Sequence, residues 1–344
     1  MRPYVILYND DENVEGGDSR DALAVVDVRD TIDPVRAALE ELGPVEVVRT
    51  GRGDPEEIAR EIKRIAPRCV FNLAEAVRGV AALESSVAGL LELLGVPYTG
   101  NTAQTLALCL DKPRTKLLLA GAGIPVPHGV VLRDAQRDPM PGLAYPAIVK
   151  PACMDASHGI DETSVVADET AARAKAAQVI ARFPPAALVE RYIDGDDALV
   201  GMIQESPGAP PTVLPLGKIG FQLPEGAPRI SSFASKWEVE SDVFRRTPGD
   251  YPGDFAPECA DRIRRVAAAA FEATGCRDYA RADVRVGFDG AVHVLEVNPN
   301  PCLIPELALA RAAGLAGWPY AALVHLFIRN AEERGPLSSL PAGR

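Results

Sequence analysis

The chain has 344 residues, of which 47% are hydrophobic and 24% charged, and its formal net charge at neutral pH is −12. This length exceeds one ordinary core and indicates a globular protein of two or three domains. No apolar run reaches about 18 residues, so we expect no transmembrane helix and no membrane partner. The acidic balance disfavours nucleic acid as a partner. The six cysteines are scattered without a zinc motif, which is typical of free thiols in the cytoplasm.

The first hundred residues alternate between strand and helix patterns. Strands are predicted at 4–8, 45–48 and 69–73, and helices at 33–43, 55–66 and 83–95. Asp33 and Pro34 are typical of a helix start, and Gly95 of a helix end. The βαβαβ order predicts a parallel sheet with right-handed crossovers.

A second unit follows, in which a lysine ends an apolar strand. Asp111 predicts a helix start that includes Lys112, and strands are predicted at 145–151, 163–166 and 187–193 around an Ala-rich helix at 170–182. Lys150 lies at the end of the first of these strands, and a loop of small residues, 154–160, follows at once. Such a loop can offer backbone N–H groups to a phosphate, although no P-loop motif is present.

The third unit predicts an antiparallel sheet with helices. A strand pattern at 212–221 precedes a loop rich in Pro and Gly at about 223–256 and an amphipathic helix at 257–275. Residues 279–300 predict a hairpin, and residues 305–333 predict helix.

The hairpin places charged side chains opposite one another. If Asp289 and Gly290 form a two-residue turn, Phe288 pairs with Ala291 and the register follows. The residues expected together on one face, in opposed pairs, are Asp283 with Glu296 and Arg281 with Asn298. The residues expected on the core face are Ala282, Val284, Leu295 and Val297.

Two opposed carboxylates destabilise a sheet unless a cation lies between them. Asp283, Glu296 and the carbonyl of Asn298 are oxygen ligands of the kind that Mg²⁺ prefers. The alternative is a solvated face, on which Arg281 and Arg285 neutralise the acids. Lys112, Lys150 and Lys236 also have an ordinary alternative, as surface lysines.

These motifs, in this order, resemble the ATP-grasp superfamily and within it the D-alanine–D-alanine ligases. The resemblance covers nearly the whole chain. The stretches that carry it are FNLAEAVRG (71–79), LLELLGVPYTGN (90–101), DKPRTKLLLAGAGIPVP (111–127), YPAIVKP (145–151), DASHGI (155–160), VERYIDGDD (189–197), SKWE (235–238) and ARADVRVGFDGAVHVLEVNPNP (280–301).

The resemblance implies an α/β and α+β fold with the three-lobed ATP-grasp architecture. We expect an N-terminal parallel βαβ substrate domain at 1–101 and a central α+β lid domain at 102–189. A C-terminal catalytic domain with an antiparallel sheet would span 190–335, followed by a frayed tail at 336–344. The resemblance also implies a homodimer.

The resemblance further implies an ATP-dependent ligase that uses Mg²⁺, with Mn²⁺ as a substitute. It would join a small-molecule carboxylate to an amine, both amino acids or short peptides, through an acyl phosphate. The implied ATP contacts are Lys112 and Lys150 for the phosphates, Ser157, His158 and Gly159 in the closing loop, Glu190 with the backbone from Arg191 to Ile193 for adenine, Asp197 for ribose, and Lys236 near the transferred phosphoryl group. The implied catalytic residues are Arg281 and Lys236, and the implied metal ligands are Asp283, Glu296 and Asn298.

The substrate positions depart from the family pattern. The family's N-terminal glutamate, which holds the first substrate's ammonium, has no equivalent in 9–28, where Asp21 or Asp27 can substitute. Ala156 replaces a loop serine, and Trp237 replaces the tyrosine after the lysine. The family's serine for the second substrate's carboxylate is absent from NPNPCLIPEL (298–307). A missing hydroxyl leaves that charge unpartnered, which disfavours D-alanine as the acceptor.

Other polar residues are candidates for the substrate site. Glu75, Arg78 and Glu84 lie where the N-terminal domain would face the substrate, and Asn300 lies where the hairpin ends. Helix-end surface charges are an equally good interpretation of the first three.

Three functions fit these observations. The first is a carboxylate–amine ligase of the dipeptide-forming type, in specialised metabolism. The second is a D-alanine–D-alanine ligase of peptidoglycan synthesis with a variant pocket. The third is a nucleotide-binding regulatory protein without catalysis, which the complete set of lysines and acids disfavours, and a carboxylate or hydroxyl kinase is a further alternative.

Overall fold

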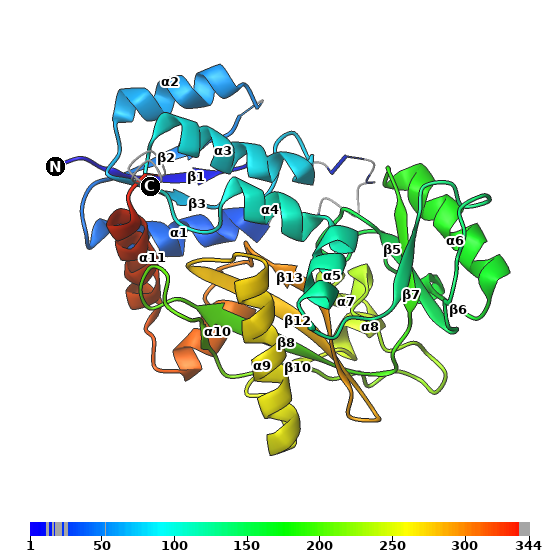
Figure 1. The fold of residues 1–344 in the computed structure, drawn as a ribbon. Coiled ribbons are helices and arrows are strands. Elements are labelled where there is room, and N and C mark those ends of the chain that lie inside the picture. Colours follow the sequence, from blue (N-terminus) through cyan, green and yellow to red (C-terminus); the bar gives the residue numbers. More distant parts are fainter. Residues whose placement is uncertain (12–13, 16, 18–22, 24–26, 52, 337–344) are drawn as a thin grey trace.

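The computed structural model describes residues 1–344 except 12–13, 16, 18–22, 24–26, 52 and 337–344. Three sheets organise the described part, one N-terminal, one central and one C-terminal (Figure 1). The fold is therefore the expected combination of a parallel βαβ unit with two antiparallel α+β units. The expected domain boundaries remain a prediction, and the one at 189 falls inside a strand of the central sheet.

The N-terminal sheet is parallel and is covered on both faces. Its strands are β1 (Tyr4–Tyr8), β2 (Val45–Arg49) and β3 (Cys69–Asn72), in the order β2-β1-β3. Helices α2 (Pro55–Ile65) and α3 (Glu84–Leu94) lie on one face, and α1 (Asp27–Glu40) lies on the other (Figure 1). Alternate residues of β1 enter the two cores, and all of Tyr4–Leu7 are buried. Burial on both faces explains the continuous apolar strands.

Helix α1 begins before the residue at which the sequence predicted its start. Pro34, expected near the first turn, lies inside the helix. Val28, Val35 and Leu39 form a buried stripe at helical spacing, so packing against the sheet extends the helix past the proline. The predicted start at Asp33 was therefore wrong.

The central sheet has the order β4-β7-β5-β6 and is antiparallel. Its strands are β4 (Gly129–Leu132), β5 (Ala147–Pro151), β6 (Val165–Val166) and β7 (Ala187–Arg191), and α6 (Glu169–Arg182) packs against it. Helices α4 (Ala103–Leu110) and α5 (Lys112–Gly121) connect this unit to the N-terminal sheet. Asp111 caps α5, since its carboxylate accepts from the Arg114 N–H, so Lys112 takes the first helical position.

The C-terminal sheet is antiparallel and has the order β11-β10-β8-β12-β13, with β9 paired to β8. The strands are β8 (Gly195–Ile203), β9 (Thr212–Val213), β10 (Gly217–Ile219), β11 (Gly249–Asp250), β12 (Tyr279–Gly287) and β13 (Val292–Asn298). Helix α9 (Pro257–Ala273) packs on this sheet. The remaining helices are the short α7 (Phe233–Trp237) and α8 (Asp242–Arg245), α10 (Ala308–Leu315), α11 (Tyr320–Arg334) and the 3₁₀ turns Ala81–Leu83 and Glu162–Ser164. Within the described ranges, none of the helices has the length and apolar character needed to cross a bilayer.

The sequence analysis missed β8, although it is a central strand. Its acidic start and Gly201 disfavour a strand when each residue is considered alone. In the fold, Asp197 pairs with Arg285 on β12, and Gly201 leaves room for the packed side chain of Leu214. Cross-strand partners therefore stabilise a strand that local preference does not predict.

The hairpin of β12 and β13 has the predicted pairs but not the predicted turn. Asp283 lies opposite Glu296, and Arg281 lies opposite Asn298. Closer to the turn the register shifts by one residue, so that Gly287 meets Ala291 around a three-residue turn. The bulge lies at Leu295, which is only half-buried and lies outside the core that Val294 enters in its place. The predicted turn and the core position of Leu295 were wrong, and the two shifts cancel at the site.

A buried ion pair joins the C-terminal helix to the start of β12. Asp278 is fully buried, and its two oxygens accept from the Arg334 guanidinium at 2.7 and 2.9 Å. The same carboxylate accepts from the Gly100 N–H at 2.8 Å, and Arg334 donates to the Tyr98 carbonyl at 3.1 Å. One carboxylate therefore connects α11, the end of the N-terminal unit and the hairpin of β12 and β13.

We expect Asp278→Asn to lower the free energy of unfolding by about 3 kcal/mol, because it leaves the Arg334 charge without its buried partner. The measurement is equilibrium unfolding in urea. Asp242→Asn is the control, since Asp242 pairs with Arg245 on the surface and should change little. Equal effects of the two substitutions would contradict the structural importance of the buried pair.

Candidate active site

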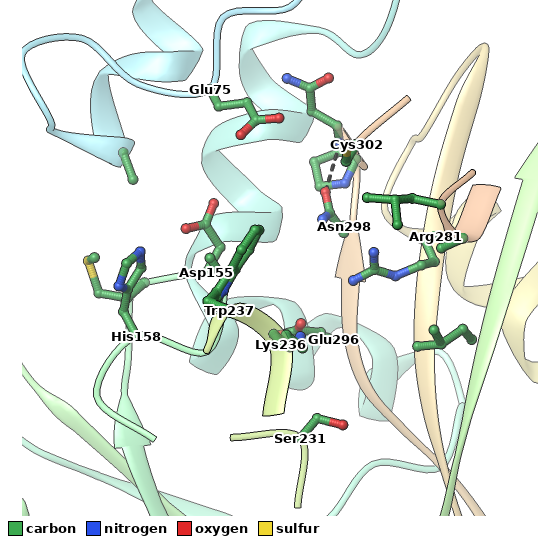
Figure 2. A pocket seen from close by; sticks show the side chains of 18 of the residues that line it. Glu75, Asp155, His158, Ser231, Lys236, Trp237, Arg281, Glu296, Asn298 and Cys302 are labelled. Atoms are coloured by element: carbon green, nitrogen blue, oxygen red, sulfur yellow. Dashed lines mark hydrogen bonds between the residues drawn. The ribbon is translucent and has the colours of Figure 1, made fainter. Parts of the chain in front are cut away.

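A cavity of about 450 Å³ is lined by residues from all three parts of the chain. The N-terminal unit contributes Glu75 and Glu84, and the loop after β5 contributes Asp155. Lys236 comes from α7, and β12 and β13 contribute Arg281 and Glu296. Figure 2 shows Glu75, Asp155, Lys236, Arg281 and Glu296 around one open space. The predicted residues that line the cavity are Lys112, His158, Lys236, Arg281, Glu296, Asn298, Glu75, Glu84 and Asn300.

On the hairpin face, Arg281 and Asp283 form a close pair. The guanidinium donates from Nε to Oδ1 at 2.6 Å and from Nη2 to Oδ2 at 3.1 Å. Asp283 is buried behind this arginine and does not itself line the cavity. Burial opposes the charge of Arg281, but Asp283 outweighs it, so the pKa of Arg281 lies above its usual range.

Glu296 lies among cations. The Lys112 Nζ is 3.4 Å from its Oε2, and Lys112 also donates to the Met154 carbonyl. Burial would raise the pKa of Glu296, but Lys112, Lys236, Lys150 and Arg281 together hold it well below its usual range. Glu296 is therefore a charged carboxylate at any physiological pH.

The donor set of this face fits a hard divalent cation. Asp283, Glu296 and Asn298 offer only oxygens, and the low pKa of Glu296 means that no proton has to leave it first. Within the described residues, no three His, Cys, Asp or Glu side chains form a metal cluster, so the asparagine carbonyl is needed to complete the set. Protein cations occupy the two carboxylates in the present arrangement.

Behind the cavity, Glu190 lies between two lysines. Lys150 Nζ is 2.5 Å from Oε1, and Lys116 Nζ is 3.0 Å from Oε2, although the second contact lacks hydrogen-bond geometry. All three side chains are less than a tenth exposed. Burial lowers the pKa of Lys116 to about 8 despite Glu190, and the two lysines outweigh burial to lower the pKa of Glu190.

Removing the shared acid should cost more than removing one lysine. Glu190→Gln leaves two buried lysines without a counter-charge, so we expect a loss of about 3 kcal/mol in the free energy of unfolding. Lys116→Met leaves a one-to-one pair and should cost less. Urea unfolding of both variants tests this order, and a larger loss for Lys116→Met would contradict it.

The loop 154–160 packs against the segment that leads to Lys236. Ser157 Oγ donates to the Ser231 carbonyl at 2.8 Å, and the Trp237 indole donates to the Ala156 carbonyl at 2.9 Å. His158 is buried, with its ring centroid 5.3 Å from that of Phe233. Of the three predicted loop residues, His158 lines the cavity, while Ser157 and Gly159 do not.

The other predicted nucleotide residues lie outside the cavity lining. Asp197 is 3% exposed, pairs with Arg285 at 3.1 Å and accepts from Ser231 Oγ at 2.7 Å. The Arg191 N–H donates to the His128 carbonyl, and Ile193 is half-buried. Lys150 and Glu190 are likewise behind the wall.

The N-terminal wall of the cavity is acidic. Glu84 is 7% exposed and accepts from the Asn300 amide at 2.9 Å, and that amide also reaches the Ala74 carbonyl at 3.3 Å. Burial raises the pKa of Glu84 to about 8; the hydrogen bond from Asn300 opposes this rise, and the nearby Asp155 adds to it. Arg78 is exposed and does not line the cavity. Asp21 lies outside the described residues, as does the side chain of Asp27.

The raised pKa of Glu84 gives a testable pH dependence. Between about pH 4.5 and 8 the folded chain holds a proton that the unfolded chain has released, so this carboxyl contributes stability that is lost as the pH rises. Glu84→Gln should remove this loss. The unfolding free energy of the variant, relative to wild type, should therefore increase from about pH 5 to about pH 8.5.

The control for this measurement is Glu57→Gln, since Glu57 is exposed on α2. Its difference from wild type should stay constant with pH. A pH-independent difference for Glu84→Gln as well would show that Glu84 is ionised in the folded chain.

The sequence analysis missed three residues that shape the site: Lys116, Tyr251 and Arg311. Lys116 could have been predicted from the sequence, because it follows Lys112 by four residues and so lies on the same face of α5. Tyr251 and Arg311 line the cavity from the long loop and from α10, and nothing local in the sequence marks them.

Comparisons with known proteins identify the family to which the chain belongs. Residues 118–329 match the family described as "D-ala D-ala ligase C-terminus". The D-alanine–D-alanine ligase of Desulforudis audaxviator is 33% identical over 87% of this chain and 92% of its own length. An uncharacterized protein, y4sG, of Sinorhizobium fredii is 30% identical over 88% of this chain and 87% of its own. A solved D-alanine–D-alanine ligase from Bacillus anthracis, complexed with ATP, superposes with a TM-score of 0.73 over 96% of this chain and 98% of its own, at 20% identity.

The three-lobed fold and the charged cavity between its parts define the class of ATP-grasp ligases, enzymes that use ATP to form C–N bonds. Within that class, the chain belongs to the D-alanine–D-alanine ligase family. It is an ATP-dependent ligase of this type.

Proposed function

We propose that the cavity activates a carboxylate as an acyl phosphate, at the expense of ATP, and transfers the acyl group to an amine with release of ADP and phosphate. The observation that carries this proposal is the face formed by Arg281, Asp283, Glu296 and Asn298, in the same cavity as Lys112 and Lys236. Negative charge builds on the transferred phosphoryl group and then on the tetrahedral oxyanion. Fixed cations around the cavity stabilise both.

In this proposal the lysines and the buried acids bind ATP. Lys112 and Lys150 hold the phosphates, the loop with Ser157, His158 and Gly159 closes over them, and Lys236 contacts the transferred group. Glu190 accepts from the adenine amine beside the backbone of Arg191 to Ile193, and Asp197 accepts from the ribose. Because Lys150 and Arg285 now pair with these acids, binding of ATP requires an exchange of partners, with Lys116 left to balance Glu190.

Asp283, Glu296 and Asn298 would hold Mg²⁺, with Mn²⁺ as a substitute. When bound, the metal neutralises phosphate charge and aligns the transferred group. Arg281 steadies the oxyanion as the amine attacks, and its pair with Asp283 fixes the direction of the guanidinium. Closure of the loop 154–160 over the phosphates would keep water from the acyl phosphate.

For the substrates, we propose two amino acids or short peptides rather than two molecules of D-alanine. The departures at Ala156, Trp237 and 298–307 support this, since they remove the hydroxyls that the family uses around its substrates. D-Alanine–D-alanine ligation, named for the Desulforudis relative, is the second candidate. We also propose a cytoplasmic location and a homodimer, both from family membership alone.

A substrate panel tests the proposal. The protein is incubated with ATP, Mg²⁺ and single or paired amino acids of both configurations, and phosphate release and products are measured. We expect phosphate release that depends on an added carboxylate and a product that contains a new amide bond. Release with D-alanine alone would support the second candidate, and ATP binding without turnover on any pair would contradict the ligase.

Glu296→Gln should lower turnover by on the order of 100-fold or more, because it removes a charged oxygen ligand from the metal site. The variant should still fold, as judged by circular dichroism. Glu57→Gln on the surface is the control and should retain full turnover. Near-normal turnover of the Glu296 variant would contradict the assignment of Glu296 as a metal ligand.

A further inference from the structure

Asn300 lies just beyond the end of β13, two residues after the proposed metal ligand Asn298. Pro299 and Pro301 flank it, and a proline has no backbone N–H, so Asn300 offers the only backbone donor of the segment 299–301. This N–H donates to Asn298 Oδ1 at 3.0 Å. The donor fixes which end of the Asn298 carboxamide is the oxygen, and the second lone pair of that oxygen remains for a cation.

The side chain of Asn300 is held mainly by the N-terminal unit. Its Nδ2 donates to Glu84 Oε1 at 2.9 Å and to the Ala74 carbonyl at 3.3 Å. Its Oδ1 accepts from the Tyr279 hydroxyl at 3.5 Å. Glu84 begins α3, and Ala74 follows β3. Both donors and the acceptor of this amide therefore have partners within the protein, so the fold sets its direction.

A second asparagine, at the end of the N-terminal unit, holds the backbone of the same segment. Asn101 is 2% exposed, and its Nδ2 donates to the Pro299 carbonyl at 2.5 Å and to the Tyr279 carbonyl at 2.9 Å. Its Oδ1 accepts from the Arg277 N–H at 2.7 Å. The carbonyl that precedes Asn300 is therefore fixed by the N-terminal unit as well.

Asn298 depends on such support more than the other two proposed ligands do. Asp283 and Glu296 lie within the paired part of the hairpin, and the cations Arg281 and Lys112 hold them. Asn298 is neutral and is the last residue of β13, where the pairing ends. Contacts that orient a metal ligand from behind change metal affinity by about 10- to 100-fold.

We propose that Asn300 is a positioning residue for the metal site: held by Glu84 and Ala74, it keeps the carboxamide oxygen of Asn298 available to the metal ion. The inference rests on the proposed function. It gives Asn300 and Glu84 a role in metal binding in place of a substrate contact. The metal affinity should therefore respond to substitutions on α3, a helix that contributes no proposed metal ligand.

Binding of Mn²⁺ in the presence of a non-hydrolysable ATP analogue, measured by electron paramagnetic resonance, tests this. Asn300→Leu removes the amide at similar volume, and we expect it to raise the Kd for Mn²⁺ about tenfold or more. Glu84→Leu should change the Kd in the same direction, because leucine cannot accept from the Asn300 amide. Glu84→Gln keeps an acceptor and should stay within about twofold of wild type. The Kd for the analogue without metal should stay within about twofold in all three variants.

Gln178→Leu, which replaces an exposed amide on α6, is the matched control and should change neither Kd. Circular dichroism checks the fold of each variant, and the two Glu84 variants decide alone if Asn300→Leu does not fold.

An unchanged Kd for Mn²⁺ in folded Asn300→Leu would overturn the inference, as would equal rises for Glu84→Gln and Glu84→Leu. A higher KM for a substrate with an unchanged Kd for Mn²⁺ would also overturn it, since Asn300 would then contact substrate. Absence of Mn²⁺ binding by the wild-type protein, or an unchanged Kd in Asn298→Leu, would overturn the proposed metal site, and the inference with it.

Discussion

Two carboxylates face each other across β12 and β13, and like charges in this position repel unless cations lie between them. Arg281 pairs with Asp283 and Lys112 pairs with Glu296, and these pairs offset the repulsion. The positive charges of Lys236 and Lys150 also stabilise the Glu296 carboxylate. Because these cations hold Glu296 ionised, the face carries the charge that the proposed metal site needs. The arrangement around the hairpin follows from this constraint, including the cap that places Lys112 at the start of α5.

Opposite charges are also paired in the protein behind the cavity wall. Glu190 between Lys116 and Lys150, and Asp197 beside Arg285, are neutral groupings buried in the wall. The fold therefore buries these charged side chains without leaving any of them as an isolated charge.

The hairpin shows how far the sequence alone leads. The opposition of Asp283 to Glu296 was predicted correctly, although a two-residue turn was assumed and the bulge at Leu295 was unforeseen, because the two shifts cancel. The parallel N-terminal sheet was also predicted correctly from the sequence, since strands buried on both faces are continuously apolar. Strand β8 was not, because its stability comes from partners on β12 that lie about 90 residues away in the chain. Tyr251 and Arg311 meet only through such tertiary packing.

The central claim is that a carboxylate oxygen becomes bonded to the γ-phosphorus before the amine attacks. Oxygen-18 in the carboxylate of an accepted substrate follows that atom directly, because the amine later displaces phosphate together with the bridging oxygen. The measurement is mass spectrometry of the inorganic phosphate released during turnover with labelled carboxylate, ATP and amine in ordinary water. We predict that each phosphate carries one oxygen-18 atom and that the amide keeps the other. Unlabelled phosphate, released together with the amide, would contradict the account.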